Sequence, residues 1–268
     1  MKTILEKLTS NRILGVLVGA LVTAIIQSSS ATTVMVVGFV NSGLMSLTSA
    51  VWVIMGANIG TTITGQLIAI DITAIAPLIA FIGVAMIVFF KSKKLDAFGS
   101  VIGGLGILFI GMETMSNAMV PLRTMPEFVG LISKFQNPFI GILVGALFTA
   151  LIQSSSASVG ILQALAKSGV MTLSSSIYVL FGQNIGTCIT SVLASIGTSK
   201  NAKRTTIIHL TFNIIGTVIF VSISMLFPFA HLVESITPNN VAAQIANVHT
   251  IFNVATTLLL LPIGTKLS

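Results

Sequence analysis

The polar tetrad Gln-Ser-Ser-Ser occurs twice in the chain, at residues 27–30 and 153–156, each time in the middle of an apolar run. Each tetrad is followed by the motif Asn-Ile-Gly-Thr, at residues 58–61 and 184–187. Hydroxyl groups, carboxamides and the free backbone amides of a helix N-terminus are donors that suit an oxyanion such as phosphate. Hydroxyl and carbonyl oxygens also suit a hard cation such as sodium. These motifs therefore predict a binding site for an anion, for sodium or for both.

Both tetrads and the asparagine of each second motif are the candidates for binding the anion: Gln27, Ser28, Ser29, Ser30, Asn58, Gln153, Ser154, Ser155, Ser156 and Asn184. An equally weighted alternative is that the two asparagines brace the chain without touching a ligand. The sodium candidates include threonines three residues apart, Thr61 with Thr64 and Thr187 with Thr190. Residues at this spacing share one face of a helix, so both hydroxyls of a pair can point to one ion.

The two motifs belong to a long internal repeat. Residues 15–70 align without a gap on residues 141–196, at a constant offset of 126 residues, and about half of the aligned positions are identical. Similarity between two unrelated apolar segments would not reproduce two polar motifs and the spacing between them. We call residues 15–70 and 141–196 unit one and unit two. They predict a fold built from two copies of one element.

The composition is that of a multi-span membrane protein. Of the 268 residues, 54% are hydrophobic and 7% are charged, against roughly 25% charged in ordinary globular domains. This excludes most soluble enzymes, nucleic-acid binders and disordered chains, and the net charge of +7 comes from short clusters between apolar runs rather than from a nucleic-acid surface. One cysteine, Cys188, excludes an intramolecular disulfide. We expect no signal peptide at the N-terminus.

We predict an all-α integral membrane protein with about six spanning helices and two re-entrant hairpins. Each spanning run is near the roughly 20 residues that a membrane helix needs. The runs are 47–70, 72–90, 98–120, 172–197, 205–228 and 241–263. The segments 13–41 and 139–167 carry a tetrad in the middle, which leaves arms of about 13 residues, enough to reach the middle of the membrane and return. We also expect the Asn-Ile-Gly-Thr motifs, with Gly56 and Gly182, to divide their helices.

The distribution of Lys and Arg favours hairpins over full crossings. With hairpins, ten of the 13 cations lie on one side of the membrane, and the positive-inside rule makes that side, with the N-terminus, cytoplasmic. The ten are Lys2, Lys7, Arg12, Lys91, Lys93, Lys94, Lys200, Lys203, Arg204 and Lys266, against Arg123, Lys134 and Lys167 opposite. The two units then enter from opposite faces, as in inverted-repeat secondary transporters. We divide the chain into a first repeat (1–97), a second, inverted repeat (98–204) and C-terminal spanning helices (205–268).

The doubled tetrad, followed by Gly-x-Asn-Ile-Gly-Thr and by a late His-x-x-Phe-Asn pattern at 209–213 and 249–253, resembles the type II sodium/phosphate cotransporter family. The likeness extends from Ile13 to Pro262. It implies a sodium-coupled phosphate symporter of the cytoplasmic membrane that works by alternating access, with phosphate held between the tetrads. It further implies a sodium site at Gln153, Ser154, Thr187 and Thr190. The equivalent set in unit one is Gln27, Ser28, Thr61 and Thr64.

The resemblance implies inorganic phosphate, sodium ions and membrane lipid as partners, with a homodimer possible, no nucleic acid and no resident cofactor. No Lys or Arg lies in the inner arms of the hairpins or in the second motifs, so a bound divalent anion would need co-bound sodium to offset its charge. Three alternatives stay open. The chain could carry another oxyanion or a small carboxylate, or form a passive anion channel. The serines and threonines could also serve only helix packing. An enzyme is disfavoured, because no base or nucleophile elbow accompanies the serines.

Overall fold

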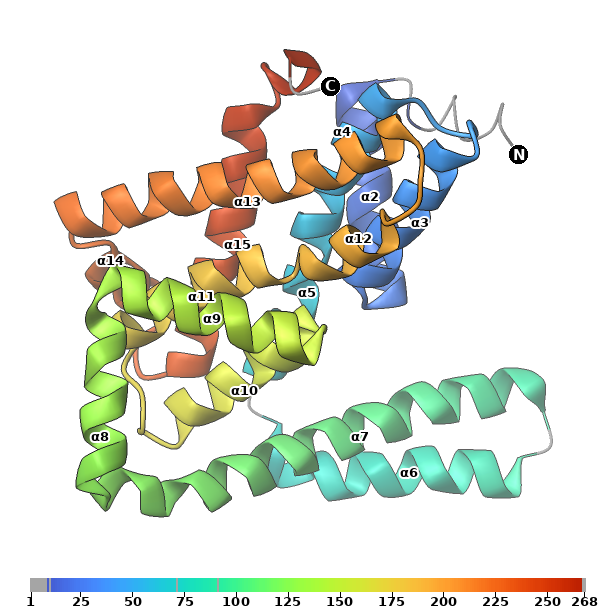
Figure 1. The fold of residues 1–268 in the computed structure, drawn as a ribbon. Coiled ribbons are helices and arrows are strands. Elements are labelled where there is room, and N and C mark those ends of the chain that lie inside the picture. The colour runs from blue at the N-terminus through green and yellow to red at the C-terminus, as the bar shows by residue number, and fades with distance from the viewer. Residues whose placement is uncertain (1–8, 10, 71, 91, 267–268) are drawn as a thin grey trace.

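The computed structural model describes residues 9, 11–70, 72–90 and 92–266 (Figure 1). Throughout these residues the chain forms helices and turns and no strand, as predicted. The α-helices of the first part are α2 (Arg12–Ile26), α3 (Ser29–Asn41), α4 (Leu47–Gly60), α5 (Thr62–Ala69), α6 (Ala76–Phe89) and α7 (Lys93–Met119). Those of the second part are α8 (Pro126–Ser133), α9 (Pro138–Ile152), α10 (Ser155–Lys167), α11 (Leu173–Gly186), α12 (Ile189–Ala194), α13 (Lys200–Leu226), α14 (Phe229–Ile236) and α15 (Val241–Leu260). Short 3₁₀ turns are η1 (Thr73–Ile75), η2 (Val120–Thr124), η3 (Lys134–Gln136) and η4 (Gly264–Lys266).

Fewer helices are long and apolar enough to cross a membrane than the six predicted. Among the described residues there are 4, or up to 5 if the bent pair Pro126–Gln136 and Pro138–Ile152 counts as one span. The 4 are Leu47–Ala69, Lys93–Thr124, Leu173–Ala194 and Lys200–Leu226. The predicted run 72–90 forms a shorter apolar helix, Thr73–Phe89. The run 241–263 forms α15, whose 20 residues include the buried polar side chains Gln244, His249 and Asn253.

Each tetrad lies at the turn between two short helices. Helix α2 ends at Ile26, Gln27 adopts the left-handed conformation (φ 59°), and α3 starts at Ser29. Helix α9 ends at Ile152, Gln153 adopts the same conformation (φ 57°), and α10 starts at Ser155. The two helical hairpins α2–α3 and α9–α10 thus have the bend where the sequence predicted it. Their outgoing arms start at the second serine of each tetrad, Ser29 and Ser155.

Glycines pack each hairpin against the next long helix of its unit. Gly19 of α2 lies against the backbone of Val53 in α4, and Gly145 of α9 lies in the same way against Val179 in α11. A side chain at either glycine would overlap a backbone carbonyl, so the helix axes approach as closely as main chains permit. The repetition of these contacts at the offset of the sequence repeat shows that the two units fold alike.

The two units are interlocked through their short helices. Helix α12 of unit two packs against α3 of unit one, and α5 of unit one packs against α10 of unit two. Each of the long C-terminal helices also contacts both units: α13 packs against α4 and α12, and α15 packs against α11 and α5. Through these contacts between the units, the bends of the two hairpins lie together in the middle of the molecule (Figure 1).

Helices α6 and α7 form a separate antiparallel hairpin that extends along one side of the molecule (Figure 1). Gly83, Gly103 and Gly106 bring the two helices into close contact. On the outside, Phe81, Phe89 and Phe98 are among the many exposed apolar side chains. An apolar surface of this kind is expected for a protein in contact with lipid.

The predicted division of α4–α5 and α11–α12 is only partly correct. Gly56, Asn58 and Gly60 lie inside α4, and the interruption is a single residue, Thr61, whose backbone keeps helical torsion angles. In unit two the interruption is Thr187–Cys188, again with helical torsion angles. The i→i−4 hydrogen bonds of Thr61 and Thr187 persist at 3.1 and 3.0 Å, which is why the predicted unwinding does not occur. Lys2, Lys7 and Lys91, used in the topology prediction, lie outside the described residues.

Candidate functional site

The two tetrads meet at their middle serines. Ser29 Oγ lies 3.2 Å from Ser155 Oγ, and both side chains are buried. Thr61, at the interruption between α4 and α5, places its Oγ1 atom 3.5 Å from the same Ser155 Oγ. The family resemblance implied that the tetrads face each other, and the structure brings together three hydroxyls, from α3, from α10 and from the junction of α4 and α5.

The first serine of each tetrad caps the outgoing helix. Ser28 Oγ accepts a hydrogen bond from the backbone N–H of Ala31 at 3.1 Å, and Ser154 Oγ accepts one from Ala157 at 3.3 Å. Capping satisfies one of the free amides of the first turn, while the amides before it have no carbonyl within the helix. The N-termini of α3 and α10, each with a partial positive charge, therefore both lie at the contact between the tetrads.

The glutamines at the two bends hold a backbone conformation that is unfavourable for them. A non-glycine residue in the left-handed region costs about 1–2 kcal/mol, and glycine is the usual residue at this position after a helix. Gln27 and Gln153 adopt it in both units. The surrounding contacts must therefore offset this cost in both units.

The carboxamide of Gln27 is engaged within unit one. Its Oε1 atom accepts a hydrogen bond from Thr64 Oγ1 at 2.7 Å, and its Nε2 group donates to the carbonyl of Ala24. Ser156 of unit two donates to the same Thr64 hydroxyl at 3.4 Å. Thr64 thus links the bend of its own hairpin to the tetrad of the other, as expected for a residue of a shared site.

The equivalent residues of unit two are arranged differently. Gln153 is exposed, whereas Gln27 is half-buried. Thr187 donates to the carbonyl of Gln183 at 2.9 Å, and Thr190 donates to that of Thr187 at 3.2 Å, so both hydroxyl protons are bonded within their own helix. The oxygen lone pairs of these threonines remain available as cation ligands, because only the protons are used.

A second pair of hydroxyls stiffens each hairpin below its bend. Thr23 donates to Thr32 at 3.0 Å in the first hairpin, and Thr149 and Ser158 lie 2.7 Å apart in the second. All four side chains are buried. The sequence contained these pairs at the offset of the repeat, but nothing in their spacing distinguished them from ordinary packing residues.

The asparagines of the second motifs point away from the tetrads. Asn58 Oδ1 faces His209 Nε2 at 3.4 Å, and Asn184 Oδ1 faces His249 Nε2 at 3.1 Å. The sequence did not predict this pairing. Their role in phosphate binding stays a prediction, and the contacts agree with the bracing alternative. The doubled His-x-x-Phe-Asn pattern was the signal that could have suggested the pairing.

Neutral groups make up the candidate site. Among the described residues, no three His, Cys, Asp or Glu side chains are grouped so that they could bind a metal ion. The groups that meet at the bends are hydroxyls, carboxamides and backbone amides, which can solvate a small anion and an alkali cation together.

The sequence profile of the Na⁺/Pi-cotransporter family matches residues 1–117 and 124–249. Both tetrads, both second motifs and the first of the two histidine patterns lie within the matched residues. The chain belongs to this family. The family assignment agrees with the resemblance that the motifs carry.

Individual relatives cover the chain to different extents. A Bacillus subtilis protein named YqeW is 33% identical over 254 residues, which are 92% of this chain and 80% of the relative. A Salmonella typhimurium protein named as a putative inorganic phosphate export protein, YjbB, is 28% identical over 238 residues, 88% of this chain and 43% of the relative. A sheep protein named sodium-dependent phosphate transport protein 2A is 49% identical over 61 residues, 23% of this chain and 10% of the relative. No solved structure matches the chain significantly.

Proposed function

We propose that the protein transports inorganic phosphate across the cytoplasmic membrane together with sodium. The main support is the contact between the two tetrads, where Ser29 and Ser155 lie 3.2 Å apart, in a chain that belongs to the Na⁺/Pi-cotransporter family. The chain spans less than half the length of the YjbB relatives, so the activity of the whole protein is part of the proposal.

Phosphate binds between the tips of the hairpins in this proposal. The hydroxyls of both tetrads and the amides at the N-termini of α3 and α10 donate to its oxygens, since phosphate accepts and these groups can donate. Ser29 and Ser155 are the central donors, and their present hydroxyl contact is replaced by bonds to the anion. The carboxamides of Gln27 and Gln153 orient the bends.

Sodium supplies the positive charge that the site lacks. Moving a divalent anion into a region of low dielectric with neutral donors alone is costly, and a co-bound cation offsets this cost. The proposed ligands are oxygens of Gln153, Ser154, Thr187 and Thr190 in unit two and of Gln27, Ser28, Thr61 and Thr64 in unit one. Coupling then follows from charge neutralisation, because neither ion binds well without the other.

The proposed topology has two re-entrant hairpins in an inverted repeat, with the repeat bounds 1–97 and 98–204 and the C-terminal helices at 205–268. One contact supports it for unit one: Ser49 Oγ, at the start of α4, donates to the carbonyl of Thr9 at 3.4 Å, so the chain returns from the hairpin to the end where it entered. In unit two, η3 before the hairpin packs against α11 after it, which is the same arrangement. Breaks buried in protein are tolerated at membrane depth.

The proposed orientation places the N-terminus in the cytoplasm. Arg12 donates to the carbonyl of Pro262 at 3.3 Å, which puts the start of α2 beside the chain segment that carries Lys266. The backbone N–H of Ser199 donates to Asn41 at 2.8 Å, which joins the end of the first hairpin to the segment that carries Lys200. Three of the basic clusters thus lie near the ends of unit one, and the positive-inside rule makes that side cytoplasmic.

Export is the second candidate, because relatives that match most of this chain are named putative inorganic phosphate export proteins. The donors of the site bind the same ion in either direction, and the direction follows from the sodium gradient. Movement of phosphate in whichever direction the imposed sodium gradient has indicates symport, whereas efflux from loaded proteoliposomes against an inward sodium gradient would indicate export.

The central test is uptake of radiolabelled phosphate by proteoliposomes that contain the purified protein. We expect saturable uptake that requires a sodium gradient and stops when choline replaces sodium. Phosphate current that follows the phosphate gradient alone would indicate a channel. Stronger competition by sulfate or a small carboxylate than by unlabelled phosphate would indicate a different substrate.

A further inference from the structure

Two buried histidines tie the C-terminal helices to the repeated Gly-x-Asn-Ile-Gly-Thr motifs. His209 on α13 contacts Asn58 on α4, and His249 on α15 contacts Asn184 on α11, each through Nε2 and the asparagine Oδ1 atom. All four side chains are at most 7% exposed. The histidines lie outside the repeat, so each contact joins one unit to a separate part of the chain.

The protons in these contacts can be assigned from the neighbouring hydrogen bonds. Asn58 Nδ2 donates to the carbonyl of Ile54 at 3.0 Å, and Asn184 Nδ2 donates to that of Leu180 at 3.2 Å. The asparagine Oδ1 atoms therefore face the histidines as acceptors. Because a carbonyl oxygen cannot donate, each histidine carries its proton on Nε2 and leaves Nδ1 as an acceptor.

A further asparagine bonds to the backbone of each histidine. Asn213 Nδ2 donates to the carbonyl of His209 at 3.0 Å, and Asn253 Nδ2 donates to that of His249 at 2.9 Å. These are the last residues of the two His-x-x-Phe-Asn patterns. In each pattern the histidine thus donates to a helix of the repeat, α4 or α11, and the asparagine donates to the backbone of its own helix, α13 or α15.

Each held asparagine lies one helical turn before a threonine of the candidate site. Asn58 precedes Thr61, whose Oγ1 atom is 3.5 Å from Ser155 Oγ, and Asn184 precedes Thr187 by the same three residues. Fixing an asparagine side chain to a neighbouring helix fixes the rotation of the turn that presents the threonine. We propose that His209 and His249 are positioning residues that orient Thr61 and Thr187 for sodium binding, an inference that rests on the proposed function.

The two pairs differ at the second ring nitrogen. His209 Nδ1 lies 3.3 Å from Ser191 Oγ, a residue of unit two. The equivalent position in unit one is Gly65, which has no hydroxyl, and among the described residues no donor faces His249 Nδ1. A Cβ atom at Gly65 would make ordinary contacts with Val159 and Ala246, and Ala246 lies one turn before His249 on α15. A side chain at position 65 therefore fits beside α15, and by the repeat its hydroxyl would take the place toward His249 that Ser191 takes toward His209.

The first experiment compares two substitutions of each histidine. Glutamine places an Nε2 donor as many bonds from Cα as the histidine Nε2, whereas asparagine is one bond too short. We expect His249→Gln to retain the half-saturating sodium concentration within about twofold and His249→Asn to raise it roughly tenfold, as for other residues that orient metal ligands. His209→Gln and His209→Asn are expected to differ in the same sense. A histidine with a merely structural role would lower the amount of folded protein and leave the sodium dependence of the remainder unchanged.

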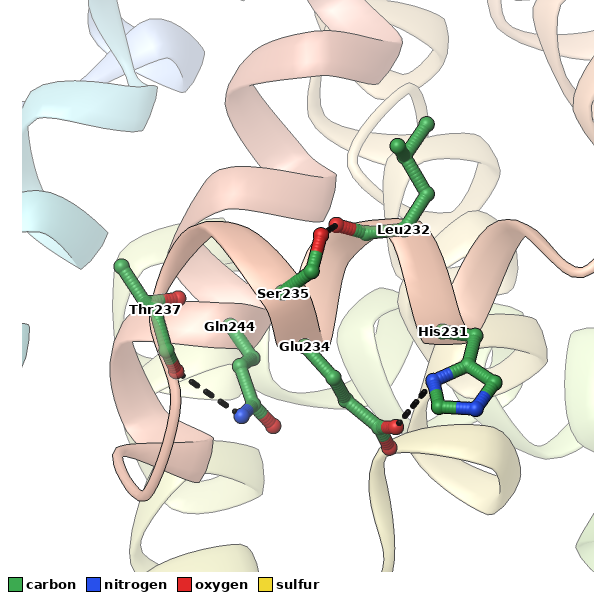
Figure 2. Close-up of polar contacts among 6 residues, drawn as sticks. All are labelled: His231, Leu232, Glu234, Ser235, Thr237 and Gln244. Carbon is green, nitrogen blue, oxygen red and sulfur yellow. Dashed lines mark hydrogen bonds and ion pairs between the residues drawn. The ribbon is translucent and has the colours of Figure 1, made fainter.

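His231 provides the matched control. It lies on α14 with its side chain 86% exposed, and its Nδ1 atom is 3.6 Å from Glu234 (Figure 2). His231→Asn should leave sodium dependence unchanged. Equal sodium dependence in wild type, His249→Gln and His249→Asn would overturn the inference while leaving the proposed function intact. Loss of sodium dependence in the wild type would instead contradict the proposed function.

The second experiment tests the geometry without transport. Gly65→Ser gives His249 Nδ1 a donor, and Gly65→Ala supplies the same Cβ atom without it. Serine is intrinsically less favourable than alanine in a helix, so the same two variants are also compared with His249 replaced by leucine. We expect the unfolding temperature of the serine variant relative to the alanine variant to be about 3 °C higher with histidine at position 249 than with leucine, which corresponds to one net hydrogen bond. An equal difference between the serine and alanine variants in both backgrounds would contradict the assigned orientation of His249.

Discussion

The two hairpins carry the same tetrad on the same backbone but in different surroundings. In unit one the carboxamide of Gln27 is bonded to Thr64, and in unit two Gln153 is exposed while Thr190 is bonded within its own helix. Behind the tetrads, unit two has the buried amides Gln163 and Gln183, where unit one has Val37 and Ala57. A repeated motif therefore fixes the bend, whereas the residues around it decide which groups are available to a ligand.

The largest expected effect tests whether the glycine contacts between helices are equally important for folding in the two units. Gly19→Ala and Gly145→Ala each place a methyl group against a backbone carbonyl, and we expect either to cost at least about 3 kcal/mol and to abolish folded protein. Gly38→Ala in α3 is the control, because its Cβ would meet no atom within 4 Å. Size-exclusion chromatography in detergent reports the outcome. Tolerance of one substitution and not the other would show that the packing is not equivalent.

The next effect concerns the contact between the tetrads. In the Ser29→Ala, Ser155→Ala double variant, phosphate loses two hydrogen bonds of about 1.5 kcal/mol each. We expect uptake at low phosphate to fall about 100-fold, with folded protein retained. Initial rates of radiolabelled uptake measure this, and the single variants show which unit contributes more. A fully active double variant would remove the tetrads from the binding site.

Substitutions of the glutamines at the bends distinguish the effect of the backbone conformation from that of the carboxamide. Gln27→Gly and Gln153→Gly relieve the left-handed strain, so we expect a thermal midpoint no more than about 3 °C below that of the wild type. Uptake should nevertheless fall roughly tenfold, because the carboxamide is lost. An equal loss of uptake in the two variants would show that the greater exposure of Gln153 does not change its contribution to transport. Full activity of both would mean that the bend alone is needed.

The smallest expected effect tests Gln183, one of the two buried amides that unit two has and unit one lacks. Gln183 Nε2 donates to the carbonyl of Ser158 at 3.0 Å, and its Oε1 atom is buried without a partner in the described part of the chain. Gln183→Met keeps the buried volume, so no cavity adds to the effect. It loses the bond but also removes an unpaired acceptor, so we expect the free energy of unfolding to change by about 1 kcal/mol or less. Thermal unfolding measures it, and a loss of several kcal/mol would show that Oε1 has a partner in the folded protein.

The sequence was sufficient to predict the helical class, the repeat and both bends, because these follow from apolar length and from the position of polar residues within apolar runs. It also predicted the pairing of the tetrads, which follows once the two units are copies of each other. It overestimated the number of spanning helices, because length does not reveal that α15 is buried with polar side chains.

Other features depend on contacts that only tertiary packing creates. The left-handed glutamines could not be predicted, since glycine is the residue that normally occupies this conformation. The pairing of Asn58 with His209 spans 151 residues, and the repetition of the His-x-x-Phe-Asn pattern was the one hint of it in the sequence. The division expected at Gly56 and Gly182 lies instead at Thr61 and at Thr187–Cys188, because the two glycines serve close helix packing.

The glycine contacts between α2 and α4 and between α9 and α11 limit how the protein can change shape. Two backbones that touch without intervening side chains have no layer that can be rearranged, so each hairpin must travel with its long helix as a rigid body. Between the units, by contrast, the tips are joined by hydroxyl contacts of 3.2–3.5 Å. Any opening that releases a bound ion is therefore easiest where the two halves of the molecule meet.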